Sequence, residues 1–107
     1  MPQTQAPKKY EAIYIIRPNL DEDAVDRTVA GVEDFMKGLG AQIELTDKKG
    51  RRRLAYEVDK MRDGYYVFTA FQAKPESISA INRMMSLSED IIRSIVVVQH
   101  KESLKSL

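Results

Sequence analysis

Positive charge is concentrated in one short stretch of this chain. Residues 48–53 read Lys-Lys-Gly-Arg-Arg-Arg, and an alternating apolar pattern follows directly. Arginine offers a planar fork of N–H donors that matches phosphate groups, and lysine adds a compact positive charge. Such a run at the start of a rigid strand suits an anionic partner of fixed geometry, for example RNA. The alternative is a solvated loop or a protected strand edge, as most charge runs are.

The apolar pattern on either side of the basic run shifts its phase. The apolar positions are Ala41, Ile43 and Leu45 before the run and Leu54, Tyr56 and Val58 after it. Because a regular strand keeps its parity, this stretch forms either a hairpin that turns at residues 48–50 or one long strand with a bulge near Gly50. We favour the bulged strand, because Lys-Lys-Gly is a poor two-residue hairpin turn. In either case we expect the cations to lie at a bend that points them away from the sheet.

The rest of the chain supplies the elements that must position this run. Alternating apolar residues predict three further strands, and apolar residues at helical spacing predict two helices. The strands span residues 10–17, 65–73 and 91–99, and the helices span about 20–39 and 75–87. Residues 59–64 are the predicted turn before the third strand, with Asp63-Gly64 as its signal. The order β-α-β-β-α-β predicts an α+β, ferredoxin-like fold, with two helices on one face of a four-stranded antiparallel sheet.

The second face of the predicted sheet is also apolar. Two helices bury only one face, yet three of the strands carry apolar residues on both. The residues expected on the open face are Ile13, Ile15, Tyr66, Phe68 and members of the 91–98 run. An exposed apolar patch usually marks a protein or ligand partner, and we favour such a partner here. The alternative is that central sheet positions tolerate apolar side chains without a function.

Composition limits what the chain can do. It has 107 residues, no cysteine and a single histidine, His100. This length fits one domain, predicted at residues 8–99, with a disordered leader over 1–7 and a flexible tail over 100–107. Little is left for a metal site or a nucleophilic triad, so we expect no cofactor and no catalytic residue. No apolar stretch is long enough to span a membrane, and we expect a cytoplasmic protein.

Two other functions fit the topology less well. An acylphosphatase would need a loop arginine and a strand asparagine, for which Arg17 and Asn19 could be offered, but no phosphate-binding loop accompanies them. A ligand-sensing domain has the same topology but would not need the arginine run. Residues 64–68 are similar to the aromatic RNA-recognition signature, but Tyr66 stands where a small residue belongs. We interpret these aromatics as packing residues.

The basic run also carries a family resemblance. Residues 50–56, Gly-Arg-Arg-Arg-Leu-Ala-Tyr, resemble the signature of the bacterial small-subunit ribosomal protein S6 family. Further matches are Tyr10-Glu11, Arg17-Pro18-Asn19-Leu20-Asp21, Gly40-Ala41 and Ile92-Arg93-Ser94-Ile95-Val96. The resemblance covers about residues 8–99. Glu57 departs from it, standing where the family commonly has proline, and so does Asp59, where a small or basic residue is common.

This resemblance implies a structural, non-enzymatic protein of the small ribosomal subunit. Such a protein would bind the central domain of the small-subunit ribosomal RNA together with ribosomal protein S18, during assembly of the platform. It would act in the ribosome of a bacterial cytoplasm or of a plastid, without a small-molecule substrate. The alternative is a ferredoxin-like ligand-sensing or protein-interaction domain that binds no RNA.

The expected site residues fall into two groups. The RNA-binding group comprises Lys48, Lys49, Arg51, Arg52, Arg53, Lys60, Arg62 and Arg93. The partner-protein interface comprises Ile13, Ile15, Tyr66 and Phe68. Because the net charge of the chain is only +1, nonspecific attraction to RNA is weak, and we expect the protein partner to assist RNA binding.

Overall fold

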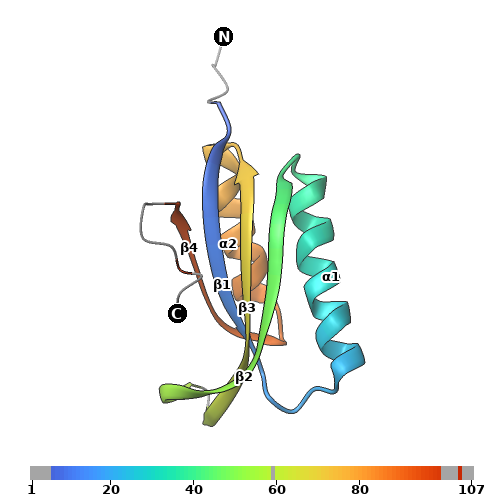
Figure 1. Ribbon diagram of the computed structural model, residues 1–107, viewed down its shortest axis with the longest axis vertical. Helices are drawn as coiled ribbons and strands as arrows, with labels where there is room; N and C mark the ends of the chain where they lie inside the picture. The colour runs from blue at the N-terminus through green and yellow to red at the C-terminus, as the bar shows by residue number, and fades with distance from the viewer. Residues whose placement is uncertain (1–5, 59, 100–103, 105–107) are drawn as a thin grey trace.

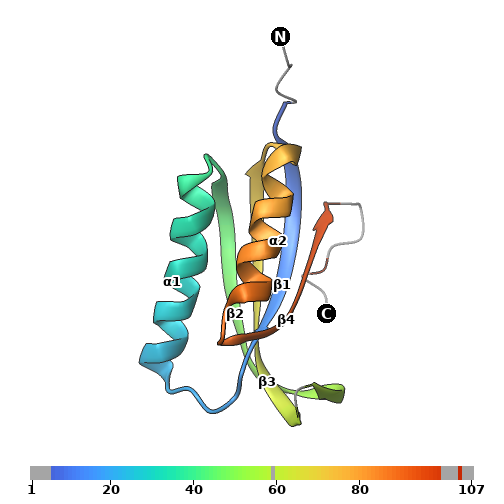
Figure 2. The same ribbon diagram turned by 180° about the vertical axis from the view of Figure 1, so that it is seen from behind.

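The computed structural model describes residues 6–58, 60–99 and 104 (Figures 1 and 2). In chain order its elements are β1 (Lys8–Ile16), α1 (Glu22–Gly38), β2 (Gln42–Val58), β3 (Met61–Ala73), a 3-10 turn η1 (Pro75–Ser77), α2 (Ile78–Leu87) and β4 (Ile91–Val98). The predicted order β-α-β-β-α-β is therefore confirmed. Most of the predicted leader and tail, residues 1–5, 100–103 and 105–107, lies outside the described part.

The four strands form one antiparallel sheet in the order β2-β3-β1-β4. Both helices lie on the same side of it, as Figure 2 shows from behind. The predicted ferredoxin-like fold is confirmed, and β1 is a central strand, as its apolar residues on both faces indicated. Neither helix within the described ranges is long and apolar enough to cross a membrane.

Local chemistry fixes the ends of α1. Asp21 is the N-cap, and its Oδ1 accepts a hydrogen bond from the Ala24 N–H at 2.8 Å. Glu22 and Asp23 in the first turn suit the positive end of the helix. The helix ends at Gly38, and Gly40 follows with a φ of 86°, a left-handed conformation that glycine adopts without strain. These signals made the position of α1 predictable.

The main core lies between the helices and the sheet. The largest fully buried side chains on the sheet side include Tyr14, Ile16 and Phe71, and α2 contributes Ile81 and Met85. Burying one such apolar side chain contributes about 1.5–3 kcal/mol. The core therefore holds both helices on one face and leaves the second face of the sheet without a helical layer.

Strand β2 is one long strand with irregular pairing. Its register to β3 shifts between Lys48 and Gly50, and Gly50 has a φ of 90°. The bulged strand favoured by the phase shift is therefore confirmed over the hairpin.

The predicted turn over residues 59–64, signalled by Asp63-Gly64, is wrong in its second half. Both residues lie inside β3, where they pair with Arg53 and Arg52, and the β2–β3 connection falls farther out, between Val58 and Met61. Gly64 is needed for packing instead, because an added Cβ would lie 2.2 Å from Ile15 Cγ2.

Candidate functional site

The basic run is part of the sheet and is divided between its two faces. Residues 48 and 50–53 all have partners in β3, from Val67 to Asp63. Since side chains alternate along a strand, Lys48 and Arg51 lie on the helix side, whereas Lys49 and Arg52 lie on the open side. The prediction of a single cluster pointing away from the sheet at a bend is wrong. Strand pairing continues through the run, and the bulge only shifts its phase.

The cations on the helix side tie β2 to its surroundings. Lys48 Nζ donates to Asp26 Oδ1 of α1 at 2.5 Å, and this hydrogen bond raises the pKa of Lys48. Arg51 Nη2 donates to the carbonyl oxygen of Pro18, in the loop before α1, at 2.7 Å. These two side chains therefore have structural partners within the chain.

The cations on the open side cover aromatic rings. Lys49 Nζ lies 5.9 Å from the centre of the Phe68 ring and 3.6 Å from Asp47 Oδ2, and its side chain is only 10% exposed. The Arg52 guanidinium lies 5.9 Å from the centre of the Tyr66 ring. A cation above a ring face is attracted electrostatically, and its aliphatic stem shields the ring from water.

The predicted apolar patch is consequently mostly covered. Phe68 is 1% exposed, Ile13 and Ile15 are also buried, and Tyr66 is half-buried. Their expected exposure is therefore wrong, because long polar side chains can bury a sheet face without a second layer of helices. Two apolar residues on this side are exposed: Ile95 of β4, which pairs with Ile13 and is 51% exposed, and Leu45 of β2, which pairs with Ala70 and is 38% exposed.

A third group of cations gathers at the far end of the β2–β3 hairpin. Arg53, Lys60 and Arg62 are exposed there. Figure 1 shows this end of the hairpin bending beneath the sheet toward the start of β4. The Arg93 guanidinium of β4 accordingly lies 5.7 Å from the centre of the Tyr56 ring. We call Arg53, Tyr56, Lys60, Arg62 and Arg93 the hairpin cluster.

Tyr56 is a candidate residue that sequence reasoning missed. It is 66% exposed and lines an open hollow of about 390 Å³ together with Arg53 and Arg62. Alternation had assigned Tyr56 to the buried face of a strand. The available signal was its place directly after the arginine run, since an exposed ring beside cations is typical of a surface on which RNA bases stack.

Comparison with known proteins identifies the family of this fold and surface. The family model described as ribosomal protein S6 matches residues 9–98. The chain belongs to the ribosomal protein S6 family. Three curated proteins similar to this S6-family chain are each named small ribosomal subunit protein bS6. That of Carboxydothermus hydrogenoformans is 34% identical over 94 residues, covering 88% of this chain and 98% of the relative. That of Exiguobacterium sibiricum is 37% identical over 94 residues, covering 88% and 99%. That of Halalkalibacterium halodurans is 38% identical over 89 residues, covering 83% and 94%.

A solved S6 structure supports the fold. The crystal structure of 30S ribosomal protein S6 from Thermotoga maritima superposes with a TM-score of 0.83 at 23% identity, covering 88% of this chain and 89% of that one. Membership of the S6 family confirms three predictions: the resemblance, a role as a small-subunit ribosomal protein, and the absence of an enzymatic function.

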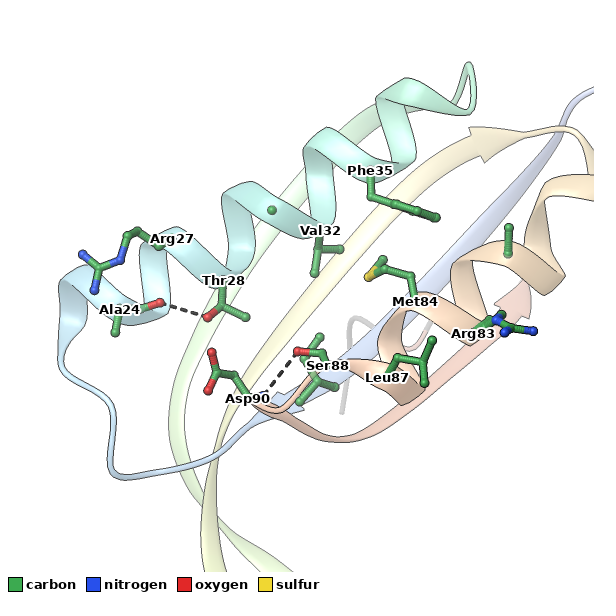
Figure 3. A pocket seen from close by; sticks show the side chains of 13 residues that line it. Ala24, Arg27, Thr28, Val32, Phe35, Arg83, Met84, Leu87, Ser88 and Asp90 are labelled. Carbon is green, nitrogen blue, oxygen red and sulfur yellow. Dashed lines mark hydrogen bonds between the residues drawn. The ribbon is translucent and has the colours of Figure 1, made fainter.

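Two features of this S6-family chain lie apart from the basic strand. Arg17, considered for a phosphate site, instead ties the end of β1 to the start of β4, because its Nε donates to Asp90 Oδ1 at 2.8 Å. A groove of about 740 Å³ runs between α1 and α2, where Phe35 and Met84 face each other (Figure 3). The groove lies on the helix side of the sheet, so it does not join the open face.

Proposed function

We propose that this S6-family chain binds the central domain of the small-subunit ribosomal RNA through the hairpin cluster and binds ribosomal protein S18 through its open sheet face. The observation that carries the proposal is the meeting of Arg93 with Tyr56 beside Arg53 and Arg62. Three cations and an exposed ring from three strands, β2, β3 and β4, form one surface at one end of the molecule. That composition suits phosphates and unstacked bases.

The eight predicted RNA-binding cations differ in the intramolecular contacts that they would lose on binding RNA. Lys48 and Arg51 hold helix-side partners, and Lys49 is nearly buried. Arg53 and Lys60 are exposed at the hairpin, and the Arg62 side chain, 3.8 Å from Glu57 Oε2, remains largely in solvent. Exposed arginines can turn to a phosphate without breaking buried contacts. We therefore assign the leading RNA contacts to the hairpin cluster and a secondary role to the other cations.

The open face supports the proposed protein interface in a modified form. Ile13, Ile15 and Phe68 are its buried floor, Tyr66 is half-buried, and Ile95 is exposed at its edge. A partner would gain contact area by moving Lys49 and Arg52 aside or by packing on their stems. We propose that S18 docks here, with Ile95 as the first point of contact.

The RNA proposal is tested with a charge-matched pair of variants. R53A/R62A/R93A removes three cations of the hairpin cluster. K8A/K37A/K74A removes three exposed lysines at the opposite end of the molecule, near the start of β1 and the ends of α1 and β3 (Figure 1). Binding to a central-domain RNA fragment in the presence of S18 is measured across a salt series.

We expect the arginine variant to lose at least about tenfold in RNA affinity and to show a shallower salt dependence, since each lost phosphate contact lowers the slope by about 0.7–0.9. The lysine variant should keep the RNA affinity and the salt dependence of the wild type. Equal losses in the two variants would show only a general charge effect and would overturn the assignment. Loss of S18 binding by Ile95→Asp, with retained folding, tests the protein interface separately.

A further inference from the structure

A carboxylate is buried in the middle of the open face. Glu11 of β1 pairs with Ala70 on one side and Val97 on the other, and it is 1% exposed. A buried carboxylate is costly unless hydrogen bonds satisfy its oxygens. Gln99 Nε2 donates to Oε2 at 3.1 Å, and the backbone N–H of Leu104 donates to Oε1 at 2.8 Å. The Glu11 carboxylate is therefore a positioned hydrogen-bond acceptor on a face that otherwise offers apolar contacts.

Leu104 fills both parts of this site. While its N–H binds Glu11, its side chain packs against the cluster of Ile13, Phe68 and Ala70. A backbone donor and an aliphatic side chain from a single residue thus contact the face side by side. This is how an extended peptide segment is recognised on a sheet: a polar group fixes the backbone, and an apolar surface receives the side chain.

We infer that Glu11 is the recognition point for S18 on the open face, and that Leu104 holds this point in the free chain until the partner displaces it. The inference rests on the proposed docking of S18 to the same face. It commits to the chemistry of the S18 segment: a large aliphatic residue whose backbone N–H is free to donate to Glu11. Leu104 and this S18 segment would use the same Glu11 oxygen and the same apolar cluster beside it. They therefore cannot occupy the site together.

Competition has a measurable consequence. When an internal segment occupies a binding site for part of the time, the apparent affinity for the partner falls by the fraction of molecules in which the site is free. Weakening the internal contact should therefore raise the affinity for S18. A structural role for Leu104 alone would predict unchanged or weaker binding, so the sign of the change distinguishes the two.

The binding test compares full-length Leu104→Ala with Leu87→Ala, a matched change at a leucine that is exposed on α2, on the helix side of the sheet. Calorimetric titration with purified S18 should show Leu104→Ala binding about three- to tenfold more tightly than the wild type. Leu87→Ala should bind as the wild type does. Equal affinity of wild type and Leu104→Ala overturns the competition while leaving S18 docking intact.

A second measurement needs no partner. In the free wild-type chain, the Leu104 amide should exchange with solvent at least about tenfold more slowly than an unprotected amide. In Glu11→Gln its NMR signal should move, because an amide has one acceptor oxygen for two donors. Exchange at the unprotected rate overturns the inference whatever S18 does.

With S18 added, the protection of the Leu104 amide should disappear. Persistent protection in the bound complex would overturn the displacement. If the wild type, Leu104→Ala and Leu87→Ala all failed to bind S18, both the proposed interface and the recognition role of Glu11 would be disproved. Protection of the Leu104 amide would then show that Leu104 makes a structural contact only.

Discussion

The Arg93 guanidinium lies 5.7 Å from the centre of the Tyr56 ring, although β4 and β2 occupy opposite edges of the sheet. The contact exists because the far end of the β2–β3 hairpin extends beyond β1 and β4 and bends beneath them (Figure 1). It fixes where the hairpin lies relative to the sheet. An arm that would otherwise project freely is thereby brought beside a cation from a distant part of the chain.

Tyr56→Ala should weaken RNA binding more than it weakens folding. An exposed cation–π contact contributes about 0.5–1 kcal/mol, so the free energy of unfolding should fall by no more than that. Loss of a ring on which a base can stack costs about 1–3 kcal/mol of binding, or roughly five- to 150-fold in affinity. Urea denaturation and RNA titration measure the two effects. Tyr56→Phe, which keeps the ring, serves as the control, and a loss of RNA affinity in this variant as large as in Tyr56→Ala would argue against stacking.

Arg51→Ala and Arg53→Ala should separate structure from RNA contact. Arg51 donates to the Pro18 carbonyl, so its loss should lower the free energy of unfolding by about 1 kcal/mol. Arg53 is exposed in the hairpin cluster, and its loss should leave stability within about 0.5 kcal/mol while reducing RNA affinity. Denaturation and binding are measured on both. The assignment would be reversed if Arg53→Ala were the less stable of the two.

Gly64→Ala should destabilise the fold by about 1–3 kcal/mol, because the added methyl group would lie 2.2 Å from Ile15 Cγ2 in a packed region. Gly31→Ala is the matched control, since nothing described lies within 4 Å of the place its methyl group would take, and its helix should gain about 0.5–1 kcal/mol. Thermal denaturation of both variants compares them. A neutral Gly64→Ala would show that Ile15 moves aside easily.

Tyr14 should make the protein less stable in alkali. Burial raises the pKa of the Tyr14 hydroxyl, and the negative charge of Glu33 adds to the effect. The unfolded chain ionises its tyrosines near pH 10, whereas folded Tyr14 stays neutral. Its contribution to stability is therefore complete below that pH and is lost as the pH rises above it. The free energy of unfolding should fall more steeply above about pH 10 in the wild type than in Tyr14→Phe. Parallel pH profiles would contradict the prediction.

The same variant tests the balance of polar groups in the core. Within the described residues, the buried hydroxyls Tyr14 Oη and Thr69 Oγ1 lie close enough for Thr69 to oppose the rise in the Tyr14 pKa, but neither has a hydrogen-bond partner of standard geometry. Removing an unsatisfied buried hydroxyl costs little and can stabilise. At neutral pH Tyr14→Phe should therefore lie within about 1 kcal/mol of the wild type, as measured by urea denaturation.

The sequence predicted those features that depend on local patterns. The order of the elements and the bulge near Gly50 are each readable from patterns a few residues long, and each was confirmed. Asp63-Gly64 was wrongly interpreted as a turn signal, because the glycine is instead required where β3 packs closely against Ile15 of the neighbouring strand β1. Local turn chemistry cannot reveal such a contact.

The composition of the candidate surfaces depends on the pairing register of the strands, which cannot be read from the sequence. Which ring lies beneath Lys49 follows from the pairing of β2 with β3 after the bulge, so the burial of Phe68 was not predictable. The approach of Arg93 to Tyr56 likewise requires the bend of the hairpin. Charge and aromatic content were visible in the sequence, but their distribution over the two faces was not.

The bulge at Gly50 makes the length of the basic run as important as its charge. Exchanging one cation for another leaves each side chain on its own face of the sheet. With the bulge kept, deleting a single residue from 51–53 would instead shift the residues that follow by one position against β3 and reverse their faces, turning Leu54 out of its contact region beside Gly64. Over this stretch, relatives that fold in the same way should vary in residue type far more freely than in residue number.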